Sequence, residues 1–287
     1  MNAESHVLSN QAQAIAEVLE PLINEGRIEV PMLPEVANKA LLLAQNPDSD
    51  ATEMAKLIQS DQSLAAHVMR IANSVAYTPM ANLVSLQQAI SRLGMRVISE
   101  IALSASIGSK LFNTPGYETY VAKKWRHALA TGLWSKEIAR HCRSNVEVAF
   151  LAGLLHSIGG PAVLQAALDA AKQQDITLTL DDVLQLEKQF SQPLAEQVVK
   201  TWKMPTLVIE SISYFSDYDN APTAIDQAAL VNAGIEFATH MLLPEVMDKE
   251  SLLVLPVMTT LNLYQDEIEK LLSQSDAVSG RLEGLSA

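Results

Sequence analysis

Cysteine is almost absent from this sequence of 287 residues, in which Cys142 stands alone. An intramolecular disulfide is therefore excluded, and a single thiol is typical of a reducing compartment. Aromatic residues are also scarce, at 5%, whereas good helix formers such as Ala, Leu, Gln and Met are plentiful. Because alternating Val, Ile and Thr are rare as well, the composition predicts an all-α protein.

Positive charge is the second shortage. The chain has 20 basic and 33 acidic residues, so its formal net charge is −13. Binding to DNA and to anionic membranes both depend on Lys and Arg, so neither is expected. The longest apolar runs, such as AFLAGLL, are much shorter than the ~18 residues of a membrane span. Since the first residues, MNAESHVLSN, also lack the pattern of a signal peptide, we expect a cytoplasmic protein.

Apolar residues recur at helical spacing along most of the chain, and prolines, glycines and capping residues divide it into segments. The predicted N-caps of three of the helices are Asp50, Asp61 and Ser85. Pro161, Pro193 and Pro205 are each expected near the start of a helix, because proline fits the first turn. Residues 113–116 are the best candidate for a subdomain boundary. The expected helices are, approximately, 10–25, 34–46, 50–60, 61–77, 85–94, 95–112, 117–142, 146–156, 161–174, 181–190, 193–202, 205–216, 222–242 and 261–274.

The segment FLAGLLHSIGG, residues 150–160, lacks one element of a metal-binding motif. It is an apolar helical run that ends in His156 and is followed by Ser157. With Asp in place of Ser157, an imidazole and a carboxylate would stand side by side at a helix end, and such a pair can hold a divalent metal. The hydroxyl of serine is a neutral, weak ligand.

Several ordered motifs surround this segment. They are a Leu-Pro entry (Leu33-Pro34), a D-x-x-L helix (Asp61 with Leu64), an Asn-Ser pair (Asn73-Ser74) and an A-I-x-x-L-G segment (Ala89-Ile90 with Leu93-Gly94), followed by WRHALATGLWSKEIA and AFLAGLLHSIGGPAVL. In this order the motifs resemble an HDOD domain, a degenerate relative of the HD phosphohydrolases. The resemblance runs from about residue 20 to about residue 215.

The resemblance implies an HD-phosphohydrolase-like helical domain, preceded by an N-terminal helical subdomain, in a protein of bacterial signalling or regulation. We expect an N-terminal helix over residues 1–19, the HDOD domain over 20–217 and a C-terminal helical extension over 218–287. Within the HDOD domain, the two subdomains would cover about 20–114 and 115–217.

The resemblance also implies that no catalytic metal site survives. His127 matches the first histidine of the HD site and His156 the second, while Ser157 replaces the aspartate. Tyr214 and Phe215 stand where a His-His pair is expected, and Asn232 and Gly234 lie near the position of a late aspartate. Two imidazoles are fewer than the three protein ligands usual for a hydrolytic metal. We therefore expect no catalytic residue, bound metal or cofactor.

The expected vestigial pocket consists of His127, His156, Ser157 and Glu187. The two histidines would then be core residues, each satisfied by a hydrogen bond. Glu187 could face this pocket, although an exposed position on its helix is the commoner fate of a glutamate. Asn73 and Ser74, the family signature, are expected to cap or bridge helices rather than to bind a ligand.

One stretch is basic against the acidic background. Six cations fall within 21 positions, with only Glu137 opposing them: Lys123, Lys124, Arg126, Lys136, Arg140 and Arg143. They could hold a nucleotide or an acidic segment of a partner, and the alternative is a solvated helix face.

Three hypotheses follow. The first is a non-catalytic regulatory protein that binds another protein in a signalling pathway. The second is a sensor that binds a nucleotide or other small ligand in the former metal pocket. The third is a metal-dependent phosphohydrolase with substitute ligands. The apolar stripe from Leu261 to Leu272 would form a homodimer or partner contact, or pack onto its own domain.

Overall fold

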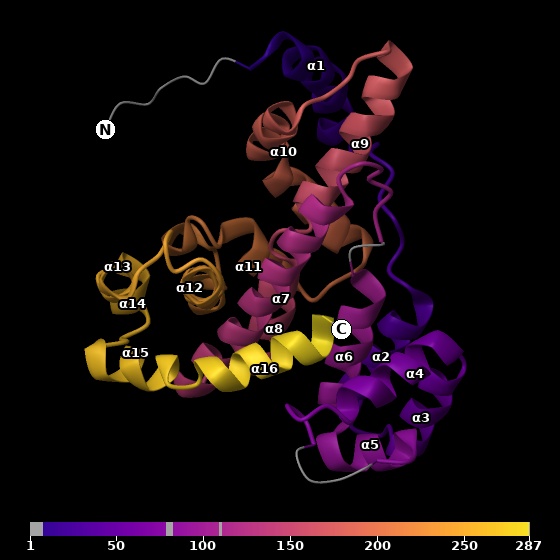
Figure 1. The fold of residues 1–287 in the computed structure, drawn as a ribbon, viewed down its shortest axis with the longest axis vertical. Helices are drawn as coiled ribbons and strands as arrows, with labels where there is room; N and C mark the ends of the chain where they lie inside the picture. Colours follow the sequence, from indigo (N-terminus) through magenta and orange to yellow (C-terminus); the bar gives the residue numbers. More distant parts are fainter. Residues whose placement is uncertain (1–7, 79–82, 109–110, 287) are drawn as a thin grey trace.

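The computed structural model describes residues 8–78, 83–108 and 111–286, and all regular elements in these ranges are helical. The first group of helices is α1 (Asn10–Asn24), α2 (Glu35–Gln45), α3 (Ala51–Gln59), α4 (Gln62–Ala72), α5 (Leu86–Leu93) and α6 (Met95–Ile107). Figure 1 shows α2 to α6 gathered in one lobe, whereas α1 lies against α9 and α10 at the opposite end. The prediction of an all-α fold is confirmed.

The second group begins with the longest helix, α7 (Glu118–His141). It is followed by α8 (Val146–Leu155), α9 (Gly159–Gln174), α10 (Leu180–Thr201), α11 (Thr206–Tyr214), the 3-10 helix η1 (Tyr218–Asn220) and α12 (Ile225–Leu242). The remaining helices are α13 (Lys249–Leu253), α14 (Pro256–Thr260), α15 (Gln265–Leu272) and α16 (Ser275–Ser286). The closest packing joins α7 with α8 and α12, and α9 with α10.

Local signals set most helix starts. The predicted caps are confirmed, because the side chains of Asp50, Asp61 and Ser85 each accept a backbone N–H from the first turn of α3, α4 and α5. Gly94 adopts a φ of +85° between α5 and α6, a conformation that L side chains rarely take. Helix α4 ends at Ala72, earlier than predicted, because the Asn73 side chain bonds to the backbone of Leu83 instead.

The predicted break before Pro193 is wrong. Helix α10 runs unbroken from Leu180 to Thr201 with Pro193 inside it. Proline in a helix interior costs about 3 kcal/mol, but Phe190, Leu194 and Ala195 on either side of it are buried in the core. Tertiary packing therefore outweighs the local signal. The other prolines fall as expected, since Pro161 lies in the first turn of α9 and Pro205 precedes α11.

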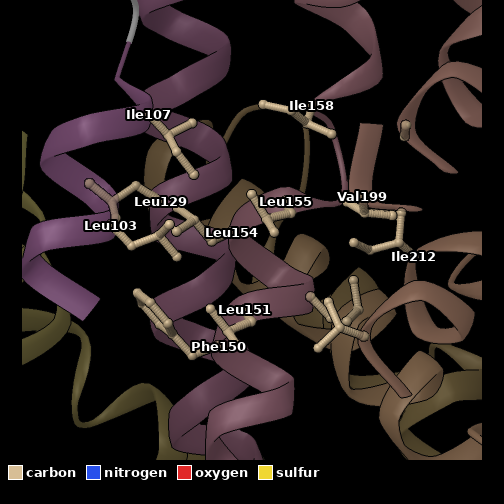
Figure 2. Packing of buried hydrophobic residues seen from close by; sticks show 14 of the residues in the cluster. Leu103, Ile107, Leu129, Phe150, Leu151, Leu154, Leu155, Ile158, Val199 and Ile212 are labelled. Carbon is tan, nitrogen blue, oxygen red and sulfur yellow. The ribbon is translucent and has the colours of Figure 1, made fainter. Parts of the chain in front are cut away.

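The core is centred on α8, whose residues from Val148 to Leu155 are all buried. Figure 2 shows side chains from α6, α7, α10 and α11 converging on this helix, Leu103 and Leu129 on one side and Val199 and Ile212 on the other. The stretch Val146–Gln174 is long and apolar enough to pass as a membrane span, but 83% of its apolar window is buried inside the fold. Packing accounts for its hydropathy.

Small residues let α7, α8 and α12 cross closely. A Cβ on Gly153 of α8 would lie 2.9 Å from Cα of Gly132 in α7. A Cβ on Gly234 of α12 would lie 2.1 Å from Oγ of Ser135 in α7. No larger side chain fits at either glycine without moving a helix. This close crossing positions the candidate site.

Candidate functional site

His127 and His156 come together, as the resemblance implies. His127 lies in α7 and His156 directly follows α8, and their ring centroids are 6.3 Å apart with the planes tilted by 60°. The crossing of α7 and α8 at Gly132 and Gly153 brings the two helices close enough for this. The sequence alone offered no distance between them.

Each imidazole is held by a hydrogen bond inside the protein. His156 Nδ1 donates to the carbonyl of Gly153 over 2.7 Å. His127 Nε2 lies 3.0 Å from Oγ1 of Thr239. The Thr239 hydroxyl also lies 2.8 Å from the Ile235 carbonyl, and in the arrangement where it donates to that carbonyl, His127 is the donor of the bond to Thr239. In that arrangement Nε2 of His127 carries the proton, and the lone pair of the neutral ring is on Nδ1, 3.5 Å from Oγ1 of Thr131.

Burial keeps both rings neutral. It lowers the pKa of His156 to about 4. It also lowers the pKa of His127, to which the nearby positive charge of Lys124 contributes. At neutral pH the pair is thus two uncharged imidazoles in an apolar setting.

The positions that would supply further ligands carry other chemistry. The ring of Phe215 packs edge-on against His156, with centroids 5.5 Å apart, while Tyr214, the last residue of α11, is only partly buried. The Asn232 amide donates to the Phe215 carbonyl over 3.0 Å. Gly234 has no side chain and lies against Ser135. An aromatic ring therefore packs against His156 from a sequence position where the resemblance implies a histidine.

Glu187 is buried, so the alternative of an exposed helical glutamate is wrong. Its Oε2 accepts a hydrogen bond of 2.6 Å from the Tyr120 hydroxyl and one of 2.5 Å from Lys124 Nζ. Burial and this contact with Glu187 raise the pKa of Tyr120. Glu187 Oε1 and Lys124 Nζ both lie close to Gly160, where a Cβ would be 3.3 and 3.1 Å from them. The carboxylate is thus neutralised by an ammonium group of the same chain.

Ser157 lies in the turn between α8 and α9 and lines a small cavity together with Lys124. The cavity has a volume of about 20 Å³, and its other walls are mostly apolar. A space of this size holds about one water molecule. Pockets for small molecules are on the order of 300 to 1,000 Å³.

Four of the six clustered cations contact carboxylates. Lys124 pairs with Glu187, and Lys136 pairs with Glu100 of α6 over 2.6 Å. The other two pairs are Arg126 with Glu283 of α16, over 2.5 Å, and Arg140 with Glu137. Lys123 and Arg143 are exposed. Three of the four acids come from helices far away in sequence, so the local charge pattern did not reveal them.

A divalent metal does not fit the residues present. Within residues 8–78, 83–108 and 111–286, no three His, Cys, Asp or Glu side chains are grouped so that they could hold an ion. The three other histidines in the described part of the chain have contacts elsewhere: His67 with Arg70, His141 with Glu267, and His240 with the Met247 carbonyl. The pair of His127 and His156 lacks the anionic ligand that would offset the charge of the ion.

Asn73 ties the end of α4 to the segment before α5. Its amide donates to the carbonyls of Met69 and Leu83 and accepts the N–H of Leu83 over 2.7 Å. Ser74 lies on the other side, where its Oγ would be 3.1 Å from a Cβ on Gly284 of α16. The hydrogen bonds of Asn73 bridge two segments as expected, whereas the Ser74 hydroxyl is buried with no hydrogen-bond partner among the described residues.

The predicted C-terminal stripe packs mainly onto its own chain. Ile268 and Leu271 are fully buried, and Leu261 and Leu272 are partly buried against the same core. Tyr264 is exposed. Little of the stripe is left as a free apolar face.

Comparison with known proteins agrees with the fold. The family model described as the HDOD domain matches residues 30–218. A candidate metal-dependent phosphohydrolase from Shewanella amazonensis SB2B is 20% identical, with 97% of this chain and 99% of that chain covered and a TM-score of 0.70. An HDOD domain protein of unknown function from Geobacter sulfurreducens is also 20% identical, with coverages of 96% and 98% and a TM-score of 0.70.

A candidate signal transduction protein from Marinobacter aquaeolei VT8 is 23% identical, covers 99% of this chain and 68% of its own, and gives a TM-score of 0.68. A curated but uncharacterised protein from Treponema pallidum (strain Nichols) is 21% identical over 222 residues. That match spans 73% of this chain but only 42% of the relative. The predicted resemblance and the HD-phosphohydrolase-like fold are confirmed.

Proposed function

Because this chain belongs to the HDOD domain family, we propose that it is a non-catalytic regulatory protein that acts by binding another protein in a bacterial signalling pathway. The observation that carries the proposal is the donor set of the vestigial pocket. Two neutral imidazoles remain there, one with its Nε2 hydrogen-bonded to Thr239 and the other packed against Phe215. Without a bound metal, such a site has no ion to activate a water molecule or to bind phosphate oxygens.

The ion pair of Lys124 with Glu187 supports the same proposal. In a metal-dependent phosphohydrolase, carboxylates and imidazoles surround a divalent cation. Here the buried carboxylate beside the pocket already has a cation, supplied by α7. A second positive charge at this place would be repelled by the Lys124 ammonium.

The signalling role is supported by similarity to a solved structure. The Marinobacter protein, a candidate in signal transduction, shares its fold with nearly the whole of this chain. A cytoplasmic location and a protein partner, rather than DNA or a membrane, belong to the proposal. They rest on the net charge of −13 and on the burial of the apolar stretch Val146–Gln174.

Binding of a nucleotide in the pocket is the weaker alternative. The cavity beside Ser157, which neither His127 nor His156 lines, is about 20 Å³ and is too small for a nucleotide. Carboxylates also neutralise four of the six cations that would attract its phosphates. A nucleotide panel that raises the melting temperature would nonetheless favour it, since a ligand at 100 times its Kd stabilises by about 2.7 kcal/mol.

Phosphoester hydrolysis is the activity to test. The chain, incubated with Mn²⁺, Fe²⁺ or Zn²⁺, is assayed for release of phosphate or of nucleoside monophosphate from a panel of mono- and diesters. The matched control is His156→Ala. We expect the two proteins to give the same background rate. Release that is clear in the natural chain and lost in His156→Ala would overturn the proposal.

A further inference from the structure

Helix α16 lies across α7 and α6, as Figure 1 shows (yellow). Its apolar residues Val278, Leu282 and Leu285 are buried in the common core. Their spacing of four and three residues places them on one face of the helix. The helix is therefore docked by a single apolar stripe, in the way that an amphipathic peptide fills a groove.

Two ion pairs fix the register of this contact. Arg281 contacts Oε1 of Glu137 over 2.5 Å, while Arg140 of α7 contacts Oε2 of the same carboxylate. The Glu137 side chain is only 3% exposed, and Arg281 pairs with the carboxylate oxygen that Arg140 does not contact. The second pair, Arg126 with Glu283, is exposed to solvent. The surface of α7 thus offers a buried carboxylate that fits a basic side chain of a docked helix.

The sequence of α16 makes a weak helix. Gly280 and Gly284 lie inside it, and glycine has the lowest helix propensity apart from proline. Packing does not require glycine at position 280, because a Cβ there would meet only Cβ of Ala76, at an ordinary distance of 3.7 Å. A groove of about 580 Å³ also remains between α16 and the segment from Ser74 to Ala76. Beside this groove Val75 is exposed.

From these contacts we propose that α16 is a displaceable latch, and that the surface it covers on α7 and α6 is where the partner protein binds. The occupant we infer is an amphipathic helix of the partner. It carries apolar residues at the spacing of Val278, Leu282 and Leu285 and a basic residue that takes the place of Arg281 opposite Glu137. This inference rests on the proposed function and names the surface that performs it.

A reversible disulfide tests the latch in the full chain. Ala76→Cys and Gly280→Cys would place their Cβ atoms about 3.7 Å apart, within the range of natural disulfides. Cys142→Ser removes the native thiol. Hydrogen exchange is then measured before and after reduction. We expect the α16 amides of the reduced chain to exchange at least tenfold faster than those of α8, and oxidation to slow α16 at least tenfold.

A second experiment measures whether a peptide with the sequence of α16 binds to the surface that α16 covers. The probe is a fluorescent peptide of residues 274–286, and the chain carries the two cysteines, Cys142→Ser and Arg281→Glu, which weakens its own latch. We expect binding in the reduced form, at least fivefold weaker binding of a peptide with Arg281→Glu, and none after oxidation. If Arg281→Glu does not fold, Glu283→Lys, at the exposed pair, replaces it.

Three results would overturn the latch: α16 exchanging as slowly as α8, equal peptide binding in the oxidised and reduced forms, or equal binding of the two peptides. If light scattering shows a dimer held by exchanged α16 helices, the occupant of the surface is a second copy of this chain, and the inference of a helix from another protein is wrong. None of these results affects the proposed non-catalytic function, which fails only if the pocket binds metal or hydrolyses a phosphoester.

Discussion

Lys124 and Glu187 form an ion pair, with 2.5 Å between Nζ and Oε2, beside the paired imidazoles of His127 and His156. The carboxylate is buried, whereas the lysine side chain is 30% exposed. The charge balance that a metal ion would bring to an HD site is thus supplied here by the chain itself. Both imidazoles and Glu187 Oε2 bond to groups of the same chain, whereas Glu187 Oε1 is buried with no hydrogen-bond partner in the part of the chain that the structure describes.

The first prediction concerns this pair. Lys124→Met leaves a buried carboxylate without its cation and should lower the free energy of unfolding by about 1–3 kcal/mol. Glu187→Gln should lower the free energy of unfolding by less, because the freed Lys124 ammonium reaches water and the new amide oxygen still accepts a hydrogen bond from Tyr120. The measurement is urea unfolding at pH 7.5.

The double variant Lys124→Met/Glu187→Gln should be more stable than Lys124→Met alone, because it leaves no unpaired charge. The control is Lys39→Met, which breaks the exposed pair of Lys39 with Glu35 and should change stability by less than about 0.5 kcal/mol. Equal losses in Lys124→Met and Lys39→Met would show that the pocket pair has no special role.

The second prediction concerns pH. Burial lowers the pKa of His156 from about 6.5 to about 4, so the unfolded chain takes up the proton more readily than the folded one. Stability that is present above pH 6.5 is therefore lost as the pH falls towards 4, by roughly 3 kcal/mol at most from this residue. His127, whose pKa is also lowered, acts in the same direction.

Urea unfolding from pH 7.5 to 4.5 measures this loss. His156→Gln removes the titrating group and keeps an N–H donor. It should make the free energy of unfolding depend less on pH between 7.5 and 4.5. The same substitution at His240, which bonds to Met247 outside the pocket, is the control. A pH dependence of His156→Gln equal to that of the natural chain would contradict the assignment.

Local signals predicted much of the fold, and long-range contacts explain what they missed. The caps Asp50, Asp61 and Ser85 act within one turn of the chain, and the structure has them as predicted. Pro193 gave an equally local signal, but it was overruled by the packing of α10 on α9, α1 and α11. Helices α13 and α14 have five residues each, which is too short for a period to be visible.

The candidate site divides in the same way. The resemblance located His127 and His156, and the structure brings them together. The resemblance did not locate Lys124 as the partner of Glu187, because that contact joins two helices far apart in sequence, α7 and α10. Glutamate is mostly exposed in proteins, and its burial here depends on a lysine that no local pattern connects with it.

The third prediction tests the packing of α9 on α10. A Cβ on Gly159 would lie 1.9 Å from the carbonyl oxygen of Ser191, so Gly159→Ala must push two buried helices apart. We expect a loss of about 3 kcal/mol or more in the free energy of unfolding.

Gly280→Ala is the matched control. Its Cβ would meet only Cβ of Ala76, at an ordinary 3.7 Å, so the substitution should stabilise α16 by up to about 1 kcal/mol through helix propensity. Thermal unfolding of both variants beside the natural chain measures the difference. A Gly159→Ala protein as stable as the natural chain would contradict the close approach of α9 to Ser191.

The central claim is that the donor set around His127 and His156 no longer holds a metal. The direct measurement is metal content per chain, by mass spectrometry, on protein purified without chelators and then exposed to manganese, iron and zinc. We predict a stoichiometry near zero, unchanged in His127→Ala and His156→Ala. One or two ions per chain, retained through dialysis and lost in either variant, would contradict the claim and make the protein a candidate enzyme.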